Sequence, residues 1–526
     1  MQLTITKLSY TYEDAPTPAL GPLSATFAEG WTGVVGSNGS GKSTLLRLVT
    51  GDLGGFTGSI VPAPARPPAP VPAAPLSASA STAAPAAAAD ASSRTPSAPS
   101  YCAQATEYPP AQAEEFALDF GSDAMRVRRI LGIQDDWVWR FDTLSHGERK
   151  RLQVAVALWL NPPVLALDEP TNHVDAATRE QILAALGQYR GVGLLVSHDR
   201  ELLDALVSHC LFMRDGSGTM RSGTYTQARE QEELERTTVA RERRAAKQEL
   251  SHLHAEQQRR RNEAARSDAR RSKRNIDPRD HSAKAKIDLA VFTGQDGKAG
   301  KLSVQLGSRI QAVEQRVASA FVPKVYDSSF WLDTKPSKRR VLVELKEGSI
   351  ALGDRRTLRI PRLFVDSTAH IGLAGPNGTG KSTLVRHLVA QLPADVPVVY
   401  LPQELGSAEA RELLGELKAL GPEERGQVLS IVARLNSDPA RILSGEALSP
   451  GELRKVLLAR GVLRAPELII MDEPTNHLDL HSTEALEAAL ASCPCALVLV
   501  SHDAAFLKAA TTTRWLFDAS GHIRVA

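Results

Sequence analysis

The stretch LDEPTNHVD occupies residues 167–175, and a near copy, MDEPTNHLD, occupies residues 471–479. Each copy directly follows a short apolar run. Such a run, ending in a carboxylate, is typical of a buried parallel strand whose acidic end lies at the edge of a sheet. We therefore expect one chain that carries the same α/β domain twice.

Other motifs repeat in the same order. They are GSNGSGKS from Gly36 and GPNGTGKS from Gly375, LSHGE from Leu144 and LSPGE from Leu448, and VSHD ending at Asp199 and at Asp503. The glycine-rich loops lie 339 positions apart and the later motifs 304, so the first copy carries 35 additional residues between them. An internal repeat of this kind predicts two domains of equal design.

Two regions lie outside the repeat. Residues 61–100 are mostly Pro, Ala and Ser, and this composition predicts a disordered surface insert, with a docking segment as the alternative. Residues 226–325 begin with a highly charged stretch that lacks Gly and Pro until Pro278, and a second helical pattern follows after residue 300. We expect a helical hairpin with its tip at residues 275–301. The predicted domains are residues 1–225, the linker 226–325, and residues 326–526.

Composition narrows the class of protein. The chain has 526 residues, a net charge of +2 and 42% hydrophobic residues, which is ordinary for a globular protein. Neither a secretory signal nor a stretch of about 18 apolar residues is readable, and four cysteines do not form a disulfide framework. We therefore expect a cytoplasmic protein, and we interpret Cys493 and Cys495 as incidental thiols.

A loop with the pattern G-x-x-x-x-G-K-S follows a short apolar strand in each copy. Such loops surround phosphates with backbone N–H groups, their lysine reaches the β- and γ-phosphates, and their serine ligates magnesium. The pattern predicts ATP and Mg²⁺ as ligands. The expected ATP-binding residues are Gly36, Ser37, Asn38, Gly39, Gly41, Lys42, Ser43 and Thr44 in the first loop, and Gly375, Pro376, Asn377, Gly378, Gly380, Lys381, Ser382 and Thr383 in the second.

Two acids end each apolar run. Asp168 and Asp472 are expected beside the magnesium ion, through its water shell. The next residues, Glu169 and Glu473, stand where the attacking water would lie, and we expect each to act as general base or to position that water.

Further polar residues recur at matching places. His198 and His502 each lie 29 residues after the glutamate of their copy, and we expect them to contact the γ-phosphate; a structural role at a strand end is the alternative. Gln104 in YCAQ and Gln403 in YLPQE are expected to sense the magnesium ion and the attacking water.

With these motifs in order, both copies resemble ATP-binding cassette domains, with Walker A, Q-loop, LSxGE signature, Walker B, D-loop and switch histidine. In that family two cassettes pair head to tail, and each ATP lies between the Walker A of one and the signature of the other. The resemblance implies two P-loop NTPase domains that hydrolyse ATP. The signature residues that it implies in ATP contact are Ser145, Gly147, Ser449 and Gly451.

The two copies differ near the nucleotide. The signatures depart from LSGGE at His146 and Pro450, but the serine and the following glycine remain, so ATP contact is expected at both. Tyr12 is expected to stack on adenine at the first site. No aromatic residue stands in the equivalent place before the second Walker A, which predicts looser adenine binding there.

EPTNH in both D-loops, two intact cassettes, no membrane segment and a long charged linker together resemble the ABC-F family of translation factors and ribosome-protection proteins. The resemblance covers nearly the whole chain apart from the Pro/Ala insert. In that family the linker is a helical hairpin whose tip enters the ribosomal E site. The resemblance implies the ribosome as partner, through rRNA and P-site tRNA, and a chain that is a monomer off the ribosome because its own cassettes pair.

The charge of the linker agrees with an RNA partner. Residues 241–274 hold twelve Lys or Arg and five acids, an excess of seven in a protein whose net charge is +2. A basic helix binds RNA through phosphate charge and shape; a solvated helix face is the alternative. The predicted RNA contacts are Arg259, Arg260, Arg261, Arg270, Arg271, Lys273 and Arg274.

Several classes of function remain to be compared. The 41 residues from Gln104 to Ser145 leave no room for the extra arm of some ABC-F subgroups, which favours an antibiotic-resistance factor over a housekeeping translation factor. The ATPase subunit of a sugar importer is a further alternative, although it would need a surface for membrane subunits. The absence of cysteine clusters excludes the iron-sulfur recycling ATPase. Intact Glu169 and Glu473 argue against a purely binding role.

Overall fold

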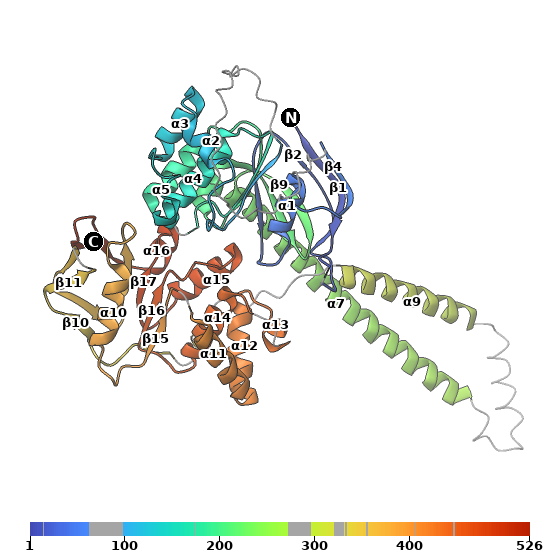
Figure 1. Cartoon of the computed structure of the whole chain (residues 1–526). Helices are drawn as coiled ribbons and strands as arrows, with labels where there is room; N and C mark the ends of the chain where they lie inside the picture. Colours follow the sequence, from blue (N-terminus) through green and yellow to red (C-terminus); the bar gives the residue numbers. More distant parts are fainter. Residues whose placement is uncertain are drawn as a thin grey trace, which may run out of the picture. The chain divides into compact units, whose positions relative to one another are not determined.

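The computed structural model describes residues 1–526 except Asp14, residues 63–97, His173, residues 272–295, 320–330, 332–333 and 354–355, Glu404 and residues 445–447; the side chains of residues 263–304, Ser407 and Ser444 are also not described. The chain divides into two compact units (Figure 1). One comprises Met1–Ala228 with Tyr326–Ala526, and the other is Arg229–Val325. The insert predicted at residues 61–100 lies almost wholly outside the described residues.

The first cassette is an α/β domain. Its strands are β1 (Leu3–Tyr10), β2 (Leu20–Phe27), β3 (Gly30–Gly36), β4 (Thr57–Val61), β5 (Ser100–Cys102), β6 (Val164–Asp168), β7 (Val192–Val196), β8 (Val207–Arg214) and β9 (Ser217–Ser222). Its helices are α1 (Lys42–Thr50), α2 (Ala113–Leu118), α3 (Ser122–Leu131), the 3₁₀ turn η1 (Phe141–Thr143), α4 (His146–Trp159), α5 (Ala176–Leu186) and α6 (Arg200–Leu206). Six strands form one sheet in the order β5-β6-β7-β3-β8-β9, and β2-β1-β4 form a separate antiparallel sheet.

The second cassette has the same main sheet. Its strands are β10 (Val341–Leu345), β11 (Gly348–Leu352), β12 (Arg356–Ile360), β13 (Leu363–Asp366), β14 (His370–Ala374), β15 (Val398–Leu401), β16 (Leu468–Asp472), β17 (Ala496–Val500), β18 (Thr513–Phe517) and β19 (Ile523–Val525). Its helices are α10 (Lys381–Gln391), α11 (Ser407–Ala419), α12 (Pro422–Arg434), α13 (Pro439–Ser444), α14 (Pro450–Val462), α15 (Leu480–Ala491) and α16 (Ala504–Ala510). The order β15-β16-β17-β14-β18-β19 matches that of the first sheet strand for strand.

The strands β6 and β16 confirm the prediction of buried parallel strands. All five positions of each are buried, and each pairs in parallel with β7 or β17. Alternate residues of β6 serve two cores: Leu165 and Leu167 belong to the core that includes Leu152 of α4, and Val164 and Ala166 to the core that includes Leu45 of α1. A strand covered on both faces is apolar along its length, and the one charged residue of β6 and of β16 is the aspartate at its carboxyl end.

This topology positions the site. The strands β3, β6 and β7 are parallel neighbours, so their carboxyl ends lie at one edge of the sheet, and the residues that follow them meet there. In the second cassette β14, β16 and β17 have the same relation.

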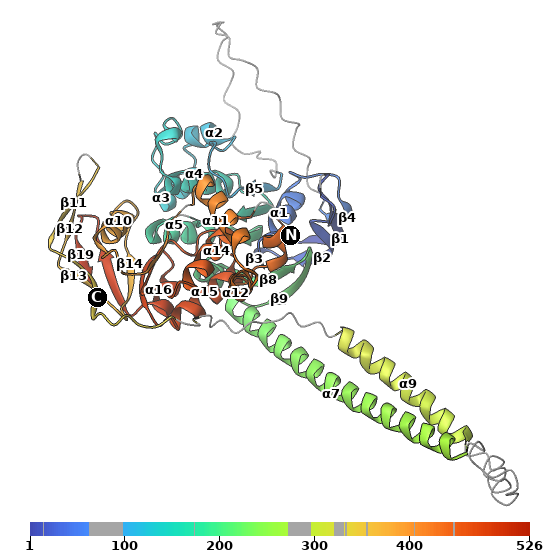
Figure 2. The same ribbon diagram turned by 90° about the horizontal axis from the view of Figure 1, so that it is seen from below.

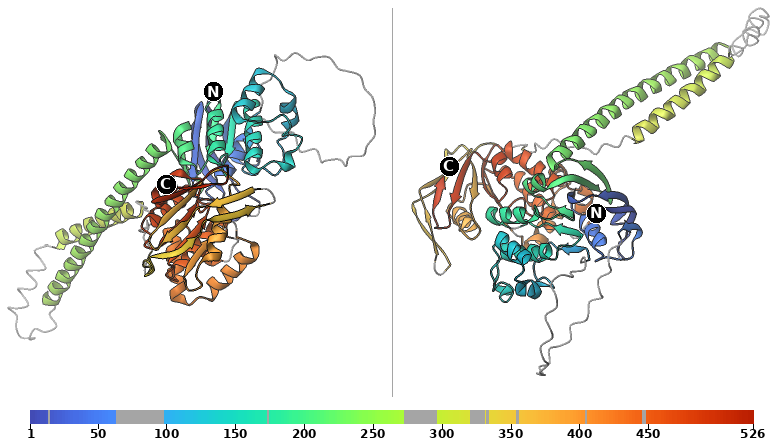
Figure 3. Two further views of the ribbon diagram at one scale, coloured as in Figure 1. Left: turned by 90° about the vertical axis from the view of Figure 1, so that its left-hand side faces the viewer. Right: turned by 90° about the horizontal axis from the view of Figure 1, so that it is seen from above.

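The second unit is a helical hairpin, as expected. Helix α7 (Tyr225–Arg271) enters it, and α9 (Asp296–Ser319) lies alongside α7 (Figures 2 and 3). Leu253 and Ala246 of α7 share a small core with Leu306 and Ile310 of α9. On the surface Arg309 and Arg316 both pair with Glu249 of α7, at 3.4 and 3.3 Å.

One boundary of the hairpin differs from the expectation. The glycines of residues 293–301 indicated an interrupted segment, but α9 begins at Asp296 and therefore includes Gly297 and Gly300. A glycine costs a helix only about 1 kcal/mol relative to alanine, so a favourable remainder of the helix outweighs it. The rest of the predicted tip, residues 272–295, lies outside the described residues.

Among the helices of the described residues, none is both long and apolar enough for a membrane crossing.

Candidate active site

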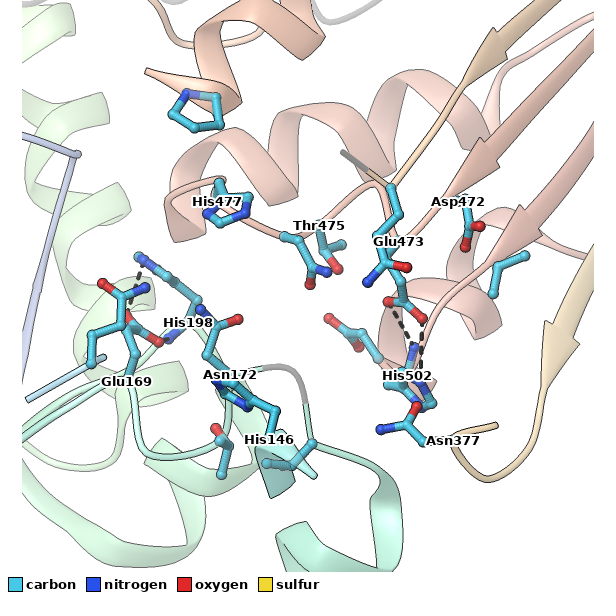
Figure 4. Close-up of a pocket in the computed structure, with 18 of the residues that line it drawn as sticks. His146, Glu169, Asn172, His198, Asn377, Asp472, Glu473, Thr475, His477 and His502 are labelled. Atoms are coloured by element: carbon cyan, nitrogen blue, oxygen red, sulfur yellow. Dashed lines mark hydrogen bonds and ion pairs between the residues drawn. The ribbon is translucent and has the colours of Figure 1, made fainter. Parts of the chain in front are cut away.

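A cavity of about 1740 Å³ has walls from both cassettes. Figure 4 shows Glu169 and His198 on one side of it, and Glu473 and His502 on the other. The cavity thus collects the chemical groups of both copies of the repeat.

Both glycine-rich loops have the geometry of a phosphate cradle. Gly39 and Gly41 have φ angles of 79° and 94°, in the left-handed region that glycine adopts without strain. A Cβ atom at Gly41 would lie 2.5 Å from the carbonyl oxygen of Ala19, so no larger residue fits. Gly378 and Gly380 repeat these angles at 73° and 98°.

The lysine of each loop is buried against that loop. Lys42 donates to the carbonyl oxygens of Gly36 and Ser37 at 2.8 and 2.9 Å. Lys381 makes the same two bonds, at the same distances, to the carbonyls at the start of its own loop. Burial lowers the pKa of both lysines, although the acids of each site oppose that effect. A buried cation beside open backbone N–H groups fits a phosphate chain as ligand.

Each glutamate after a Walker B strand is held against the switch histidine of its own cassette. The backbone N–H of His198 donates to Oε2 of Glu169 at 3.2 Å, and His198 Nε2 lies 3.0 Å from Oε1. For Glu473 and His502 both distances are 3.4 Å.

The backbone of both glutamates is strained. Glu169 and Glu473 each have a φ of 49°, in a region that L-residues with a Cβ seldom adopt. Each backbone N–H also donates to the end of the neighbouring strand, at Val196 or Val500, at 2.9 Å. The surrounding contacts that hold this backbone conformation orient the carboxylate, and strain of this kind is typical of functional sites.

Burial shifts the protonation of these groups. Burial, the largest cause, raises the pKa of Glu169 and of Glu473 to about 8 each; within that value the neighbouring aspartate raises the pKa and the loop lysine lowers it. Burial, with help from Lys42, lowers the pKa of His198 to about 4. Near neutral pH the nucleotide-free first site therefore pairs a protonated Glu169 with a neutral histidine.

The Walker B aspartates fit a hard cation. Asp472 accepts a hydrogen bond from the Ser382 hydroxyl, while burial, the larger effect, raises the pKa of Asp472. Its second oxygen, Oδ1, is buried and has no hydrogen-bond partner among the described residues. A serine hydroxyl next to a carboxylate with a free lone pair is the donor set that Mg²⁺ takes in nucleotide sites. In the first cassette Asp168 differs, because its Oδ2 accepts the Tyr101 hydroxyl at 3.0 Å.

The signature serines begin helices. Ser145 and Ser449 are the N-caps of α4 and α14, and each exchanges hydrogen bonds with the glutamate three residues later. Of the two motifs, the residues that line the cavity are His146, Ser449 and Pro450.

The D-loops connect the cassettes. The Asn38 side chain donates to the carbonyl oxygen of His477 at 3.0 Å, and the Asn38 backbone N–H donates to Asp479 at 3.4 Å. Conversely, the backbone of Asn377 donates to Asp175. The Walker A loop of each cassette thus contacts the D-loop of the other.

Most residues predicted from the sequence come together in this cavity, and some do not. Those that line it are Asn38, Gly39, Gly41, Lys42, Ser43, Thr44, Tyr12, Gln104, Asp168, Glu169, His198, Asn377, Gly378, Gly380, Lys381, Ser382, Thr383, Gln403, Ser449, Asp472, Glu473 and His502. Those outside its lining are Gly36, Ser37, Gly375, Pro376, Ser145, Gly147 and Gly451.

The predicted RNA contacts belong to the hairpin. Arg259, Arg260 and Arg261 are exposed on α7, and Arg260 pairs with Glu256. Arg270 and Arg271 end α7 with undescribed side chains, and Lys273 and Arg274 lie outside the described residues.

Two pairs of residues at the site were not predicted from the sequence. Tyr101 and Tyr400 each stand three residues before the predicted glutamine, a repeat that could have marked them. Leu352 and Arg356 line the cavity beside the second Walker A loop, where no aromatic residue replaces Tyr12; the Arg356 guanidinium would lie 3.8 Å from a Cβ at Gly378. No motif announces these two, because a β-hairpin brings them there.

Known proteins share these features. Residues 20–172 and 358–476 match the ABC transporter family. The chain is 31% identical to the Tylosin resistance ATP-binding protein TlrC of Streptomyces fradiae, over 90% of this chain and 89% of that one. It is 26% identical to the Ribosome protection protein VmlR of Bacillus subtilis (strain 168), over 99% and 87%. It is also 26% identical to the Energy-dependent translational throttle protein EttA of Haemophilus influenzae, over 91% and 85%.

Solved structures agree on the fold. An archaeal ribosome recycling factor, aABCE1, solved in complex with the stalk protein aP1, superposes with a TM-score of 0.60 and 17% identity, covering 99% of this chain and 89% of that one. A structure of the RNase-L Inhibitor gives 0.59 at 17% identity, with 99% and 90% coverage. At such identity the likeness shows the fold alone: two cassettes in tandem.

Proposed function

The chain belongs to the ABC-F family of ATP-binding cassette proteins and is an ATPase, and from this premise we propose that it acts on the ribosome as an antibiotic-resistance protection factor. The observation that carries the proposal is a helical hairpin with exposed arginines on α7, joined to two complete ATP-binding cassettes. Relatives named for ribosome protection and for tylosin resistance over nearly the full chain support it.

In each ATP site the residues have distinct tasks. Lys42 and Lys381 leave their loop carbonyls to bind the β- and γ-phosphates, and the loop N–H groups hold the remaining phosphate oxygens. Ser43 with Asp168, and Ser382 with Asp472, are the residues that would hold Mg²⁺. When bound, Mg²⁺ neutralises phosphate charge and favours displacement at the γ-phosphorus.

The glutamates then handle the proton. Burial raises the pKa of Glu169 and of Glu473 to about 8, close to the working pH, and the ionised carboxylate accepts a proton from the attacking water. The histidine beside each glutamate contacts that carboxylate and can donate to a phosphate oxygen. Gln104 and Gln403, both exposed to the cavity, position the water.

Pairing of the cassettes couples ATP to movement. Ser449 and Gly451 bind the ATP held by Lys42, and Ser145 and Gly147 bind the ATP held by Lys381. The D-loop contacts of Asn38 are the cross-cassette bonds that such closure would strengthen.

Movement of the cassettes is then transmitted to RNA by the hairpin. Its arginines fit the phosphate backbone of rRNA and tRNA, which binds by charge and shape. Action at the E site, with the tip towards P-site tRNA, explains how drug binding would be opposed without contact to the cassettes. A ribosomal partner places the protein in the cytoplasm. A housekeeping translation factor is the alternative, since EttA matches over a similar length.

Co-sedimentation with ribosomes tests the proposal. The Glu169→Gln, Glu473→Gln double variant should pellet with ribosomes in ATP but not in ADP, and retention should weaken as salt rises. Replacing Arg259, Arg260 and Arg261 by Gln should weaken retention and flatten the salt dependence by about one unit of slope per lost phosphate contact. The matched control replaces three arginines of the first cassette, Arg126, Arg129 and Arg140.

The outcomes separate the alternatives. If both triple variants lose retention equally, the hairpin is not the RNA contact. If the protein does not pellet with ribosomes in an ATP-dependent manner, a ribosomal role is refuted. Restored in vitro translation in the presence of antibiotics that bind near the peptidyl-transferase centre supports protection. Nucleotide-dependent binding without rescue supports a translation factor instead.

A further inference from the structure

A buried arginine connects three parts of the second cassette. Arg454 of α14 is only 4% exposed. Its guanidinium donates to the carbonyl oxygens of Asp472 and Glu473 at 2.5 and 2.6 Å, of Pro402 at 2.8 Å and of Asn476 at 3.3 Å. One side chain thus holds the backbone of Walker B, the residue before Gln403, and the D-loop.

The same helix begins with the signature serine. Ser449 caps α14, and its capping box with Glu452 fixes the first turn. Arg454 follows in the second turn, five residues after the cap. A displacement of Ser449 therefore moves Arg454 with it, because a hydrogen-bonded helical turn moves as a body.

A second contact ties the signature to the D-loop. A Cβ atom at Gly451 would lie 2.4 Å from the carbonyl oxygen of His477. The start of α14 therefore packs directly on the backbone that follows Glu473.

The first cassette has a lysine in the place of Arg454. Lys150 occupies the same place in the repeat and is fully buried. Its ammonium donates to the carbonyls of Ala103 and Gln104 and to the side chain of Gln153, at 2.9 to 3.1 Å. It reaches the Q-loop but makes no hydrogen bond to Walker B in the described part of the chain. A lysine ammonium presents its donors from a single atom, so it cannot reach the Q-loop backbone and the Walker B backbone together as the planar guanidinium does.

We propose that Arg454 is a positioning residue that couples the two ATP sites in one direction: contact of Ser449 with the nucleotide at the first site sets the backbone of Glu473 at the second. Because Glu473 has a strained φ of 49°, its carboxylate direction depends on what holds that backbone. The inference rests on the crosswise pairing of signatures and Walker A loops proposed above, and not on ribosome binding.

Single-turnover ATP hydrolysis by the full chain without ribosomes tests the coupling. In a Glu169→Gln background ADP forms at the second site, and in a Glu473→Gln background at the first. Arg454→Lys should slow the second site by about tenfold, the scale of a lost charged hydrogen bond, and change the first by less than about twofold. ATP affinity should not change. The matched control, Arg460→Lys, alters an arginine of the same helix that pairs with Glu416 on α11, and it should change neither rate.

A double-mutant cycle isolates transmission from simple support. Ser449→Ala should slow the second site when Arg454 is present and have little further effect together with Arg454→Lys. If the rate effects of Ser449→Ala and Arg454→Lys multiply in the double variant, the two residues act independently. If Arg454→Lys slows both sites equally and lowers the melting temperature, the role of the arginine is only structural. Either result overturns the proposal.

The reciprocal exchange avoids loss of a buried partner. Lys150→Arg gives the first cassette a guanidinium group like that of Arg454. Ser145→Ala should therefore slow ATP hydrolysis at the first site more in that variant than in the native chain. No change in coupling from either exchange also overturns the proposal. If neither Glu→Gln background yields a site-specific rate, the assignment of the glutamates fails, and the coupling fails with it.

Discussion

Glu169 and His198 touch twice: the histidine N–H donates to one carboxylate oxygen at 3.2 Å, and the ring Nε2 lies 3.0 Å from the other. The pair recurs at 3.4 Å in the second cassette as Glu473 and His502. Each carboxyl group thus accepts a hydrogen bond at Oε2, has the histidine ring beside Oε1, and lines the cavity from a strained backbone.

Replacing Glu473 by Gln should lower the single-turnover rate at the second site by about 10²- to 10⁴-fold, the usual contribution of a general base. ATP binding should persist, because the amide keeps the shape of the carboxyl group. Chemical quench measures the rate, and a fluorescent nucleotide measures binding. Glu467→Gln, just before β16, is the control, and an unchanged rate in Glu473→Gln would exclude the proposed base.

The pH dependence of stability should reveal the buried glutamates. Their pKa rises from 4.5 to about 8 on folding, so between these values the folded nucleotide-free protein binds more protons than the unfolded chain. The free energy of unfolding therefore falls as pH rises through this window. Gln cannot ionise, so the melting temperature of the Glu169→Gln, Glu473→Gln variant should exceed the native one by a margin that grows from pH 5.5 to pH 8.5.

Differential scanning calorimetry at fixed ionic strength measures that margin. Glu467→Gln serves again as the control and should show no trend. A margin that is constant over the whole range would mean that both carboxyl groups are already ionised in the folded protein.

Asn38→Ala should weaken closure of the two cassettes. The variant loses the bond from the Asn38 side chain to His477, which is worth about 1 kcal/mol, or roughly fivefold in ATP needed for closure. Trapping of ATP by the double Glu→Gln variant, followed by filtration, measures the effect. Asn262→Ala, an exposed change on α7, is the control; equal trapping by both would show that the contact does not support closure.

Tyr101→Phe should lower the Mg²⁺ concentration that half-saturates the first site, by a factor of roughly 2 to 5, because it frees Oδ2 of Asp168 from one hydrogen bond. Titration of Mg²⁺ in the Glu473→Gln background measures this. Tyr400→Phe is the matched control, since Tyr400 makes no such bond to Asp472 in the described part of the chain. A rise in the required Mg²⁺ would mean that Tyr101 orients the ligand instead of competing for it.

The fold could be predicted because its signals are local. The runs VLALD and LIIMD are apolar at four of five positions, which only strands buried on both faces tolerate, and they became β6 and β16. The hairpin followed from charge and from the absence of Gly and Pro. Its second helix, α9, begins earlier than expected, because the free-energy cost of two glycines is smaller than the stabilisation from the rest of the helix.

The contacts of the site could be predicted only in part. His198 and Glu169 stand 29 residues apart in both copies, but their contact requires β6 to lie next to β7, an order that one sequence does not state. Tyr101 meets Asp168 for the same reason, through β5. No motif in the sequence singles out Arg454. Its burial depends on the packing of α14, and hydrogen bonds from a buried cation to main-chain carbonyls leave no pattern of residue types.

The left-handed backbone at Glu169 and Glu473 has a practical consequence for protein engineering. A residue with a Cβ held at φ 49° costs of order 1 kcal/mol that glycine would not, and each buried carboxyl group adds its own cost above pH 4.5. A directed-evolution campaign that screens this protein for heat resistance alone would therefore enrich substitutions at these two positions. It would deliver robust proteins that grip nucleotide and never release phosphate, so any such screen needs a turnover assay alongside the heat step.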